Sequence, residues 1–236
     1  MSDLDATTPR VFLVRHGETE WTKNGRYTGA TELDLTPNGV KQVTDTAIQL
    51  VGPQKLIDPA RILHAWISPR KRTQQTFQHF FGARIPSSDL TIDADKITLS
   101  EDLTEWDYGD YEGMRVEEIT ASRKQRGLDQ KNAWNIWQHG CEGGESAEQV
   151  TERLDRLIGQ ISNIQRPYMN GEKPADVVLV AHGLILRAFV KRWLKYPLDA
   201  PLTMMLSPGA VGILSYRNHN VDDRGLFIGT ALPPME

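Results

Sequence analysis

The sequence is poor in the features that mark secreted and membrane proteins. Its 236 residues include one cysteine, Cys141, which cannot form an internal disulfide and which we expect to be buried or half-buried. No uninterrupted apolar run approaches the length of a membrane span. The N-terminal stretch MSDLDATTPR is polar and acidic, without the basic start and apolar core of a secretory signal. We therefore expect a cytoplasmic protein that does not bind membranes.

Excess positive charge and low-complexity sequence are also absent. The formal net charge is -4 and the sequence pI is about 5.9, so the chain has no general attraction for nucleic acid. Any anion must be bound by arginines placed locally. Because we find neither a linker nor an internal repeat, we expect a single domain over 1–236, with 1–9 as a flexible N-terminus.

Apolar strand-like runs alternate with helical patterns along the chain. We predict strands at 11–14, 62–67, 97–104, 176–181, 211–216 and 226–230. We predict a helix from Pro37 to about residue 51 with Thr36 as N-cap, and a second one after Ser68 and Pro69, which form a cap pair. We predict a third helix over 116–127 that Gly127 ends, and a fourth over 146–161 with Ser146 and Gln149 as a capping box. A fifth helix is predicted over 183–194. Since parallel neighbours need crossover helices, this alternation predicts an α/β fold: a three-layer sandwich with a mostly parallel sheet and helices on both faces.

The stretches VRHG and VAHG place His16 and His182 directly before a glycine, each at the end of an apolar strand. Ligands of such sheets bind at the carboxyl ends of the strands, and glycine lets the backbone approach a ligand closely. A lone histidine at such a place is often only structural. Here, however, Arg15 precedes one histidine, and Arg72 lies in the first turn of a predicted helix. These groups indicate an anion site, and a phosphoryl group suits arginine.

Motifs for metal-dependent and nucleotide chemistry are missing. The chain has no HExxH, no CxxC and no histidine pair at i,i+4, although paired histidines as metal ligands are the competing interpretation. The neighbouring arginines would repel a divalent cation. The stretch NGRYTG is not a P-loop, since it lacks the GK[ST] ending. We expect no metal and no cofactor.

With phosphate as the ligand, His16 is the candidate nucleophile. It needs one neutral ring nitrogen facing phosphorus, and Arg15 and Arg72 would help to keep the ring unprotonated. A general acid must protonate the departing alkoxide, and Glu105 in LTEWDYGDYEG is the candidate. A solvated carboxylate in a turn is the competing interpretation of Glu105.

Five stretches together resemble the histidine phosphatase superfamily, also called phosphoglycerate mutase-like proteins. They are VRHGETEWTKNGRYTG, SPRKRTQQT, LTEWDYGDYEG, GGES before a helix, and VAHGLILR. The resemblance implies a phosphorylated His16, a clamp on the phosphoryl oxygens by Arg15, Arg72 and His182, and Glu105 as proton donor and later as base for water. It also implies a homo-oligomer.

Further residues have implied contacts to the substrate. Tyr27, Thr28 and Tyr108 would touch it, Gly183 would offer a backbone contact, and Arg187 would bind a second phosphate. A surface arginine is the competing interpretation of Arg187. We expect Arg70, which stands in sequence beside Lys71 and Arg72, to be peripheral.

The run RGLDQKNAWNIWQHGCEGGES is similar to the sedoheptulose bisphosphatases within this superfamily. It implies a metal-independent hydrolase of a small phosphorylated sugar, sedoheptulose 1,7-bisphosphate first and fructose 1,6-bisphosphate next. Two alternatives stay open: a cofactor-primed phosphoglycerate mutase, and a non-catalytic phosphate-binding protein. Against the mutase, this chain has TEWDYG, with Trp106 and Asp107, at the place where phosphoglycerate mutases have a stretch that resembles NERHYG.

The segment 194–210 is shorter than the corresponding part of that group, which puts substrate size in question. It could close over the pocket. Within it, we expect Met204, Met205 and Leu206 to be local core rather than a lipid-binding surface.

Overall fold

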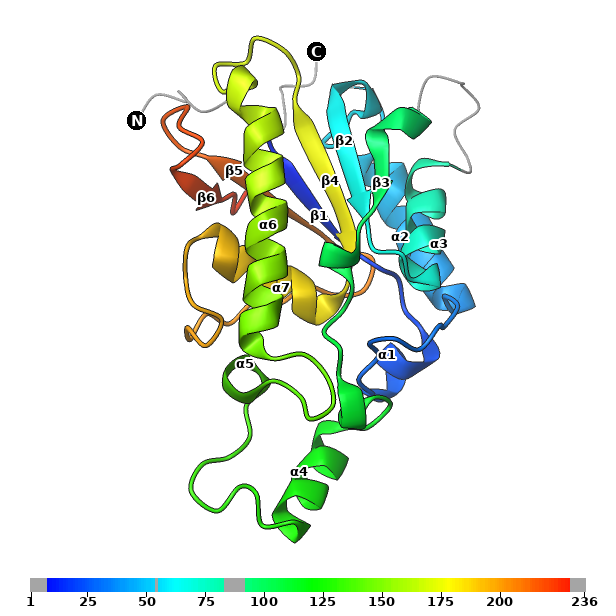
Figure 1. The fold of residues 1–236 in the computed structure, drawn as a ribbon. Helices are drawn as coiled ribbons and strands as arrows, with labels where there is room; N and C mark the ends of the chain where they lie inside the picture. The colour runs from blue at the N-terminus through cyan, green and yellow to red at the C-terminus, as the bar shows by residue number, and fades with distance from the viewer. Residues whose placement is uncertain (1–7, 54, 83–91, 230–236) are drawn as a thin grey trace.

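A six-stranded mixed sheet organises the chain in the computed structural model, which describes residues 8–53, 55–82 and 92–229 (Figure 1). The strand order is β3-β2-β4-β1-β5-β6. The first four strands in sequence pair in parallel, whereas β5 pairs antiparallel with β1 and β6 antiparallel with β5. The strands are β1 (Val11–Arg15), β2 (Ile62–Ile67), β3 (Ile97–Leu99), β4 (Asp176–Ala181), β5 (Val211–Tyr216) and β6 (Arg224–Leu226). The predicted α/β class with a mostly parallel sheet is confirmed.

The central strands β1 and β4 are apolar except for Arg15 and Asp176 at their ends, because helices cover both faces of the sheet. Along β1, Val11 and Leu13 pack into one core cluster, and the alternate residues Phe12 and Val14 pack into the other. The helices are α1 (Glu20–Asn24), α2 (Pro37–Leu50), α3 (Lys71–Phe81), α4 (Val116–Gln125), α5 (Ile136–His139), α6 (Ala147–Gln165) and α7 (Gly183–Trp193). Helices α6 and α7 cover the first face and α2 and α3 the second (Figure 1).

The predicted caps of the long helices are present. The Thr36 side chain accepts a hydrogen bond from the Gly39 N–H at 2.9 Å, and Ser146 and Gln149 form the reciprocal capping box that starts α6. Gly127 lies two residues after the end of α4, in the left-handed region with φ of 70°. These ends were predictable because capping depends on residues only three or four positions apart.

Three predicted boundaries were wrong. Ser68 and Pro69 do not cap α3: the Ser68 N–H donates to Val180 O at 2.9 Å, which continues the pairing of β2 with β4, and the helix begins at Lys71 with Arg70 as N-cap. The extended segment 97–104 is a strand only to Leu99, followed by a 3₁₀ turn over Glu101–Leu103. The last strand begins at Arg224 opposite Tyr216 and ends at Leu226, and residue 230 lies outside the described residues.

Two short helices and one methionine also differ from expectation. Helices α1 and α5 have five and four residues, too short to show a helical period in the sequence. Met205 is 95% exposed, so the prediction of local core was wrong for it, whereas Met204 and Leu206 pack partly against the core. Cys141 is buried as expected.

The ends of the chain and its helices complete the description. Of the expected N-terminal tail, residues 1–7 lie outside the described part, while Thr8 and Pro9 are buried. None of the helices in the described ranges is both long and apolar enough to cross a bilayer.

Helix α2 lies very close to the turn that follows β1. A Cβ atom at Gly39 would lie 2.2 Å from the Glu18 carbonyl oxygen, so this approach requires glycine. The Glu18 carboxylate in turn accepts a hydrogen bond from the Thr36 hydroxyl at 2.7 Å. These contacts fix the path of the chain directly after His16.

Candidate active site

The carboxyl ends of three parallel strands meet at one point. His16 follows β1 and its N–H donates to Ala181 O at 3.0 Å, so the end of β1 is tied to the end of β4, where His182 follows. Ser68 follows β2, and its Oγ atom forms a hydrogen bond of 2.7 Å with His182 Nε2. Sheet pairing therefore brings together groups that are more than 100 residues apart in the sequence.

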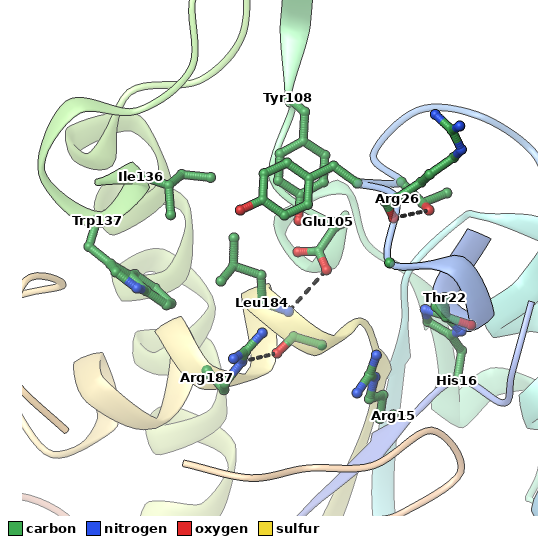
Figure 2. Close-up of a pocket in the computed structure, with 14 residues that line it drawn as sticks. Arg15, His16, Thr22, Arg26, Glu105, Tyr108, Ile136, Trp137, Leu184 and Arg187 are labelled. Atoms are coloured by element: carbon green, nitrogen blue, oxygen red, sulfur yellow. Dashed lines mark hydrogen bonds between the residues drawn. The ribbon is translucent and has the colours of Figure 1, made fainter. Parts of the chain in front are cut away.

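A cavity of about 390 Å³ opens at this point (Figure 2). Eight of the ten predicted site residues line it, and the other two, Arg72 and His182, are fully buried beside His16. The lining residues are Arg15, His16, Thr22, Gly25, Arg26, Tyr27, Thr28, Glu105, Tyr108, Ile136, Trp137, Gly183, Leu184 and Arg187.

His16 is a neutral imidazole with a fixed orientation. Its Nδ1 lies 2.7 Å from Gly17 O, and since a carbonyl only accepts, Nδ1 carries the proton. Among the described residues, nothing hydrogen-bonds to Nε2. Burial, and then the positive charge of Arg72, lower the pKa of His16 to about 3. The ring therefore presents an unprotonated Nε2 at neutral pH.

The tautomer of His182 is set by Arg72. The Arg72 Nε can only donate, and it donates to His182 Nδ1 at 3.1 Å, so the proton of the neutral ring is on Nε2 and is donated to Ser68 Oγ. Burial, followed by the charge of Arg72, holds the pKa of His182 well below its usual value. Both ring nitrogens thus have protein partners, and the predicted contact of His182 with a phosphoryl group stays a prediction.

The guanidinium of Arg72 also organises the loop beside it. Its terminal nitrogens donate to the carbonyl oxygens of Thr28, Gly29 and Thr31 at 2.9–3.0 Å. Four of its five N–H groups therefore donate hydrogen bonds to other residues of the protein. The structure places Arg72 next to His16, but its predicted clamp on phosphoryl oxygens also stays a prediction.

Arg15 lines the cavity and has one buried donor without a partner among the described residues. One terminal nitrogen donates to Leu206 O at 2.6 Å, while the buried Nε has no partner among the described residues. The guanidinium lies against Gly183, where a Cβ atom would be 2.9 Å from Arg15 Cζ. Burial lowers the pKa of Arg15, which means that this cation is poorly solvated. A buried donor of this kind suits an anionic ligand.

Glu105 is held by the N-terminus of α7 (Figure 2). Its Oε2 accepts from the Leu184 N–H at 3.0 Å, and its Oε1 accepts from the N–H groups of Ile185 and Trp106, both at 2.9 Å. Because Oε2 accepts only one hydrogen bond, it keeps a lone pair for the cavity. The carboxylate thus lies in the cavity rather than in a solvated turn, and it is 8% exposed.

An aromatic pair and a further arginine also line the cavity. Tyr27 and Tyr108 stack with ring centroids 4.5 Å apart, and burial raises the pKa of both hydroxyls, so both stay neutral donors. Thr28 is buried next to them. Arg187 donates from Nε to Gly183 O at 2.9 Å, and no described residue accepts from its terminal nitrogens. Arg187 is therefore a cavity residue and not a surface arginine.

Six lining residues escaped the sequence analysis: Thr22, Gly25, Arg26, Ile136, Trp137 and Leu184. Trp137 comes from the short helix α5, and the ammonium of Lys191 lies 4.0 Å from its ring centroid. The stretch AWNIWQHG contributes Ile136 and Trp137 to the cavity, but its apolar residues show no helical period that would predict α5. Trp106 and Asp107, in contrast, do not line the cavity: Trp106 is fully buried and Asp107 is exposed. Their bearing on the mutase alternative stays a prediction.

The charge of the cavity suits an anion more than a cation. Neither Arg15 nor Arg72 forms an ion pair with a carboxylate within the part of the chain that the structure describes, and Arg187 adds a third guanidinium. The same part contains no group of three or more His, Cys, Asp or Glu side chains that could hold a metal ion. Arg70 lies apart, with its guanidinium 3.4 Å from the Glu32 carboxylate.

Known proteins are similar to this chain in sequence and in fold. The profile described as histidine phosphatase superfamily (branch 1) matches residues 11–224. Sedoheptulose 1,7-bisphosphatase of Saccharomyces cerevisiae is 35% identical over 99% of this chain and 97% of its own length. Acid phosphatase of Mycobacterium tuberculosis is 34% identical over 89% of this chain and 87% of its own. A solved structure of a Mycobacterium tuberculosis open reading frame superposes with a TM-score of 0.69, at 29% identity and with 93% and 96% of the two chains covered.

The buried neutral state of His16 predicts a pH-dependent stability. The unfolded chain binds a proton near pH 6.5, whereas the folded His16 binds it only near pH 3, so the free energy of unfolding falls as the pH falls between these values. Between about pH 7.5 and about pH 5 this contribution is ~2 kcal/mol. In urea unfolding, the free energy of unfolding should fall between these two pH values by ~2 kcal/mol less in His16→Asn than in the unchanged protein, because asparagine has no proton to bind. An equal loss in both proteins would contradict a buried neutral His16.

Proposed function

The chain belongs to the histidine phosphatase superfamily (branch 1), and we propose that it hydrolyses a sugar bisphosphate, without a metal, through a phosphohistidine at His16. Its class is that of a phosphoric monoester hydrolase, as the family and the named phosphatase relatives indicate. Sedoheptulose 1,7-bisphosphate is the first candidate substrate and fructose 1,6-bisphosphate the second.

One observation carries the proposed mechanism: a neutral His16, whose Nε2 has no partner among the described residues, lines the same cavity as Arg15, whose guanidinium has no carboxylate partner among them. A neutral imidazole is a nucleophile, and positive charge that is already in place stabilises the charge that develops on phosphoryl oxygens. Because Nδ1 donates to Gly17 O, the positive charge that the ring gains on phosphorylation is partly stabilised by a carbonyl dipole.

In the first transfer, the lone pair of His16 Nε2 forms a bond to phosphorus while the bond from phosphorus to the sugar oxygen breaks. Glu105, entering this step protonated, gives its proton to the departing alkoxide and becomes a carboxylate. The Leu184 and Ile185 N–H groups hold that carboxylate in place. The products of this step are the free sugar hydroxyl and phosphohistidine.

In the second transfer, water attacks phosphorus opposite Nε2. Glu105 takes one proton from the water, the P–N bond breaks, and the electron pair returns to the ring. Inorganic phosphate leaves, with His16 neutral and Glu105 protonated again. The cycle needs no metal ion, since the guanidinium groups supply the positive charge.

The substrate assignment has two supports. The first is the similarity to a yeast protein named for sedoheptulose 1,7-bisphosphate, over nearly the whole chain. The second is Arg187, whose terminal nitrogens are free of protein acceptors within the described residues and whose side chain lines the same cavity as His16. A second phosphate would give this cation a partner. A cytoplasmic location and a homo-oligomer stay predictions.

A substrate panel tests the proposed function. We expect phosphate release from sedoheptulose 1,7-bisphosphate and fructose 1,6-bisphosphate to continue in excess chelator, and 3-phosphoglycerate to be isomerised more slowly than either bisphosphate is hydrolysed, with or without 2,3-bisphosphoglycerate. Loss of activity in chelator would contradict the metal-free mechanism. Faster isomerisation than hydrolysis would identify a mutase, and phosphate binding without any turnover would identify a non-catalytic protein.

The second-phosphate role of Arg187 has its own test. Replacing Arg187 by Gln removes a charged hydrogen bond, so kcat/KM for a bisphosphate should fall about 10- to 100-fold, as expected for a loss of ~1.5–3 kcal/mol. Fructose 1-phosphate and fructose 6-phosphate, each of which has only the phosphate that its own hydrolysis would cleave, should change by less than about threefold. Arg192→Gln on the same helix, which pairs with Asp155 outside the cavity, is the control. Equal losses on the bisphosphate and on the monophosphates would show that Arg187 does not bind a second phosphate.

A further inference from the structure

We propose that Arg153, together with Glu145, is a positioning residue that sets the place of the Glu105 carboxylate in the cavity. The inference rests on the proposed role of Glu105 as the general acid. Arg153 lies on α6 and does not line the cavity.

The segment that carries Glu105 has no regular structure of its own. It follows the 3₁₀ turn Glu101–Leu103, and residues 105–108 belong to neither a helix nor a strand. No ladder of backbone hydrogen bonds fixes such a segment, so its buried polar groups must find partners elsewhere. A general acid, however, has to lie within hydrogen-bonding reach of the leaving oxygen.

Arg153 supplies partners on one side of Glu105. One of its terminal nitrogens donates to Asp102 O at 2.8 Å and to Thr104 O at 2.9 Å, and the second of these carbonyls belongs to the residue directly before Glu105. The other two nitrogens of the guanidinium form a two-pronged pair with the Glu145 carboxylate, at 2.8 and 2.9 Å. The Arg153 side chain is only 8% exposed, so these contacts are shielded from water.

Glu145 supplies partners on the other side. Its Oε2 accepts from the Asp107 N–H at 2.9 Å, and its backbone N–H donates to Asp107 O at 3.0 Å. Its carbonyl oxygen accepts from the Trp106 indole N–H at 2.9 Å. The chain is thus held both just before and just after Glu105 by one ion pair, in which Arg153 is buried and Glu145 half-buried, while α7 holds the Glu105 carboxylate itself.

The geometry makes arginine specific at position 153. A lysine would keep the charge, but a single ammonium group cannot reach both carboxylate oxygens and both carbonyls with the planar arrangement of a guanidinium. In Arg153→Lys, the segment should relax and the Glu105 carboxyl should move relative to the leaving oxygen. A shift on the order of 1 Å costs up to about 100-fold in rate.

The leaving group of the substrate separates positioning of the acid from general damage. A sugar phosphate releases a basic alkoxide that needs a proton, whereas p-nitrophenyl phosphate releases a stable phenolate that does not. We expect Arg153→Lys and Glu145→Gln to lower kcat for the sugar bisphosphate about tenfold or more, with p-nitrophenyl phosphate changed by less than about threefold and KM little changed for either. Arg156→Lys is the matched control, because Arg156 also lies on α6 but donates to the Asp102 carboxylate and to no carbonyl next to Glu105.

Equal losses on the two substrates, or no loss on either, would overturn the proposal. If thermal melting shows that Arg153→Lys does not fold, Glu145→Gln, which keeps Arg153 and its two carbonyl partners, decides by the same criterion. Glu105→Gln separates this proposal from the proposed function. If Glu105→Gln loses as much activity on p-nitrophenyl phosphate as on the sugar bisphosphate, the assignment of Glu105 as the acid is wrong. If Glu105→Gln loses more on the sugar bisphosphate but Arg153→Lys does not, only the positioning role of Arg153 is wrong.

Discussion

Positive charge that is buried without a carboxylate partner is the constraint on which the rest of the site depends. Arg15 and Arg72 are both desolvated, and neither forms an ion pair within the described part of the chain. Such cations cost free energy unless an anion joins them. The same charges, added to burial, keep His16 neutral and leave its Nε2 available. Such a site favours an anion, and in the proposed function a phosphoryl group supplies negative charge beside these two arginines.

The fold meets this constraint by joining strand ends. The parallel pairing of β1, β2 and β4 places His16, Ser68 and His182 at one edge of the sheet. Helix α7 begins at the same edge, and the Glu105 carboxylate accepts from two of its first N–H groups, where a helix would otherwise need a side-chain cap. The proposed acid is thus also part of the helix that presents Arg187. The proposed nucleophile, the proposed acid and Arg187 therefore lie together where β1 and β4 end and α7 begins.

Local sequence signals predicted much of this arrangement. Apolar runs ending in His-Gly located β1 and β4, and the caps at Thr36 and Ser146 depend on near neighbours in the chain. The resemblance to a family supplied the site residues, because its five stretches carry them. What the sequence could not show depends on tertiary contacts: the tautomer of His182, which Arg72 sets across 110 positions, and the wall formed by the four-residue helix α5. The prediction of Ser68 as a cap was wrong for the same reason, since strand pairing to Val180 overrides a local preference.

The central claim is that the phosphoryl group passes through His16, and a single-turnover experiment tests it most directly. The enzyme is mixed with a sugar bisphosphate, quenched in alkali where phosphohistidine survives, and digested for mass spectrometry. The account predicts one added phosphoryl group on the peptide that contains His16, attached to Nε2, formed before inorganic phosphate is released and absent from His16→Asn. Release of phosphate with no phosphorylated His16 at any time, or a phosphoryl group on another residue, would contradict it.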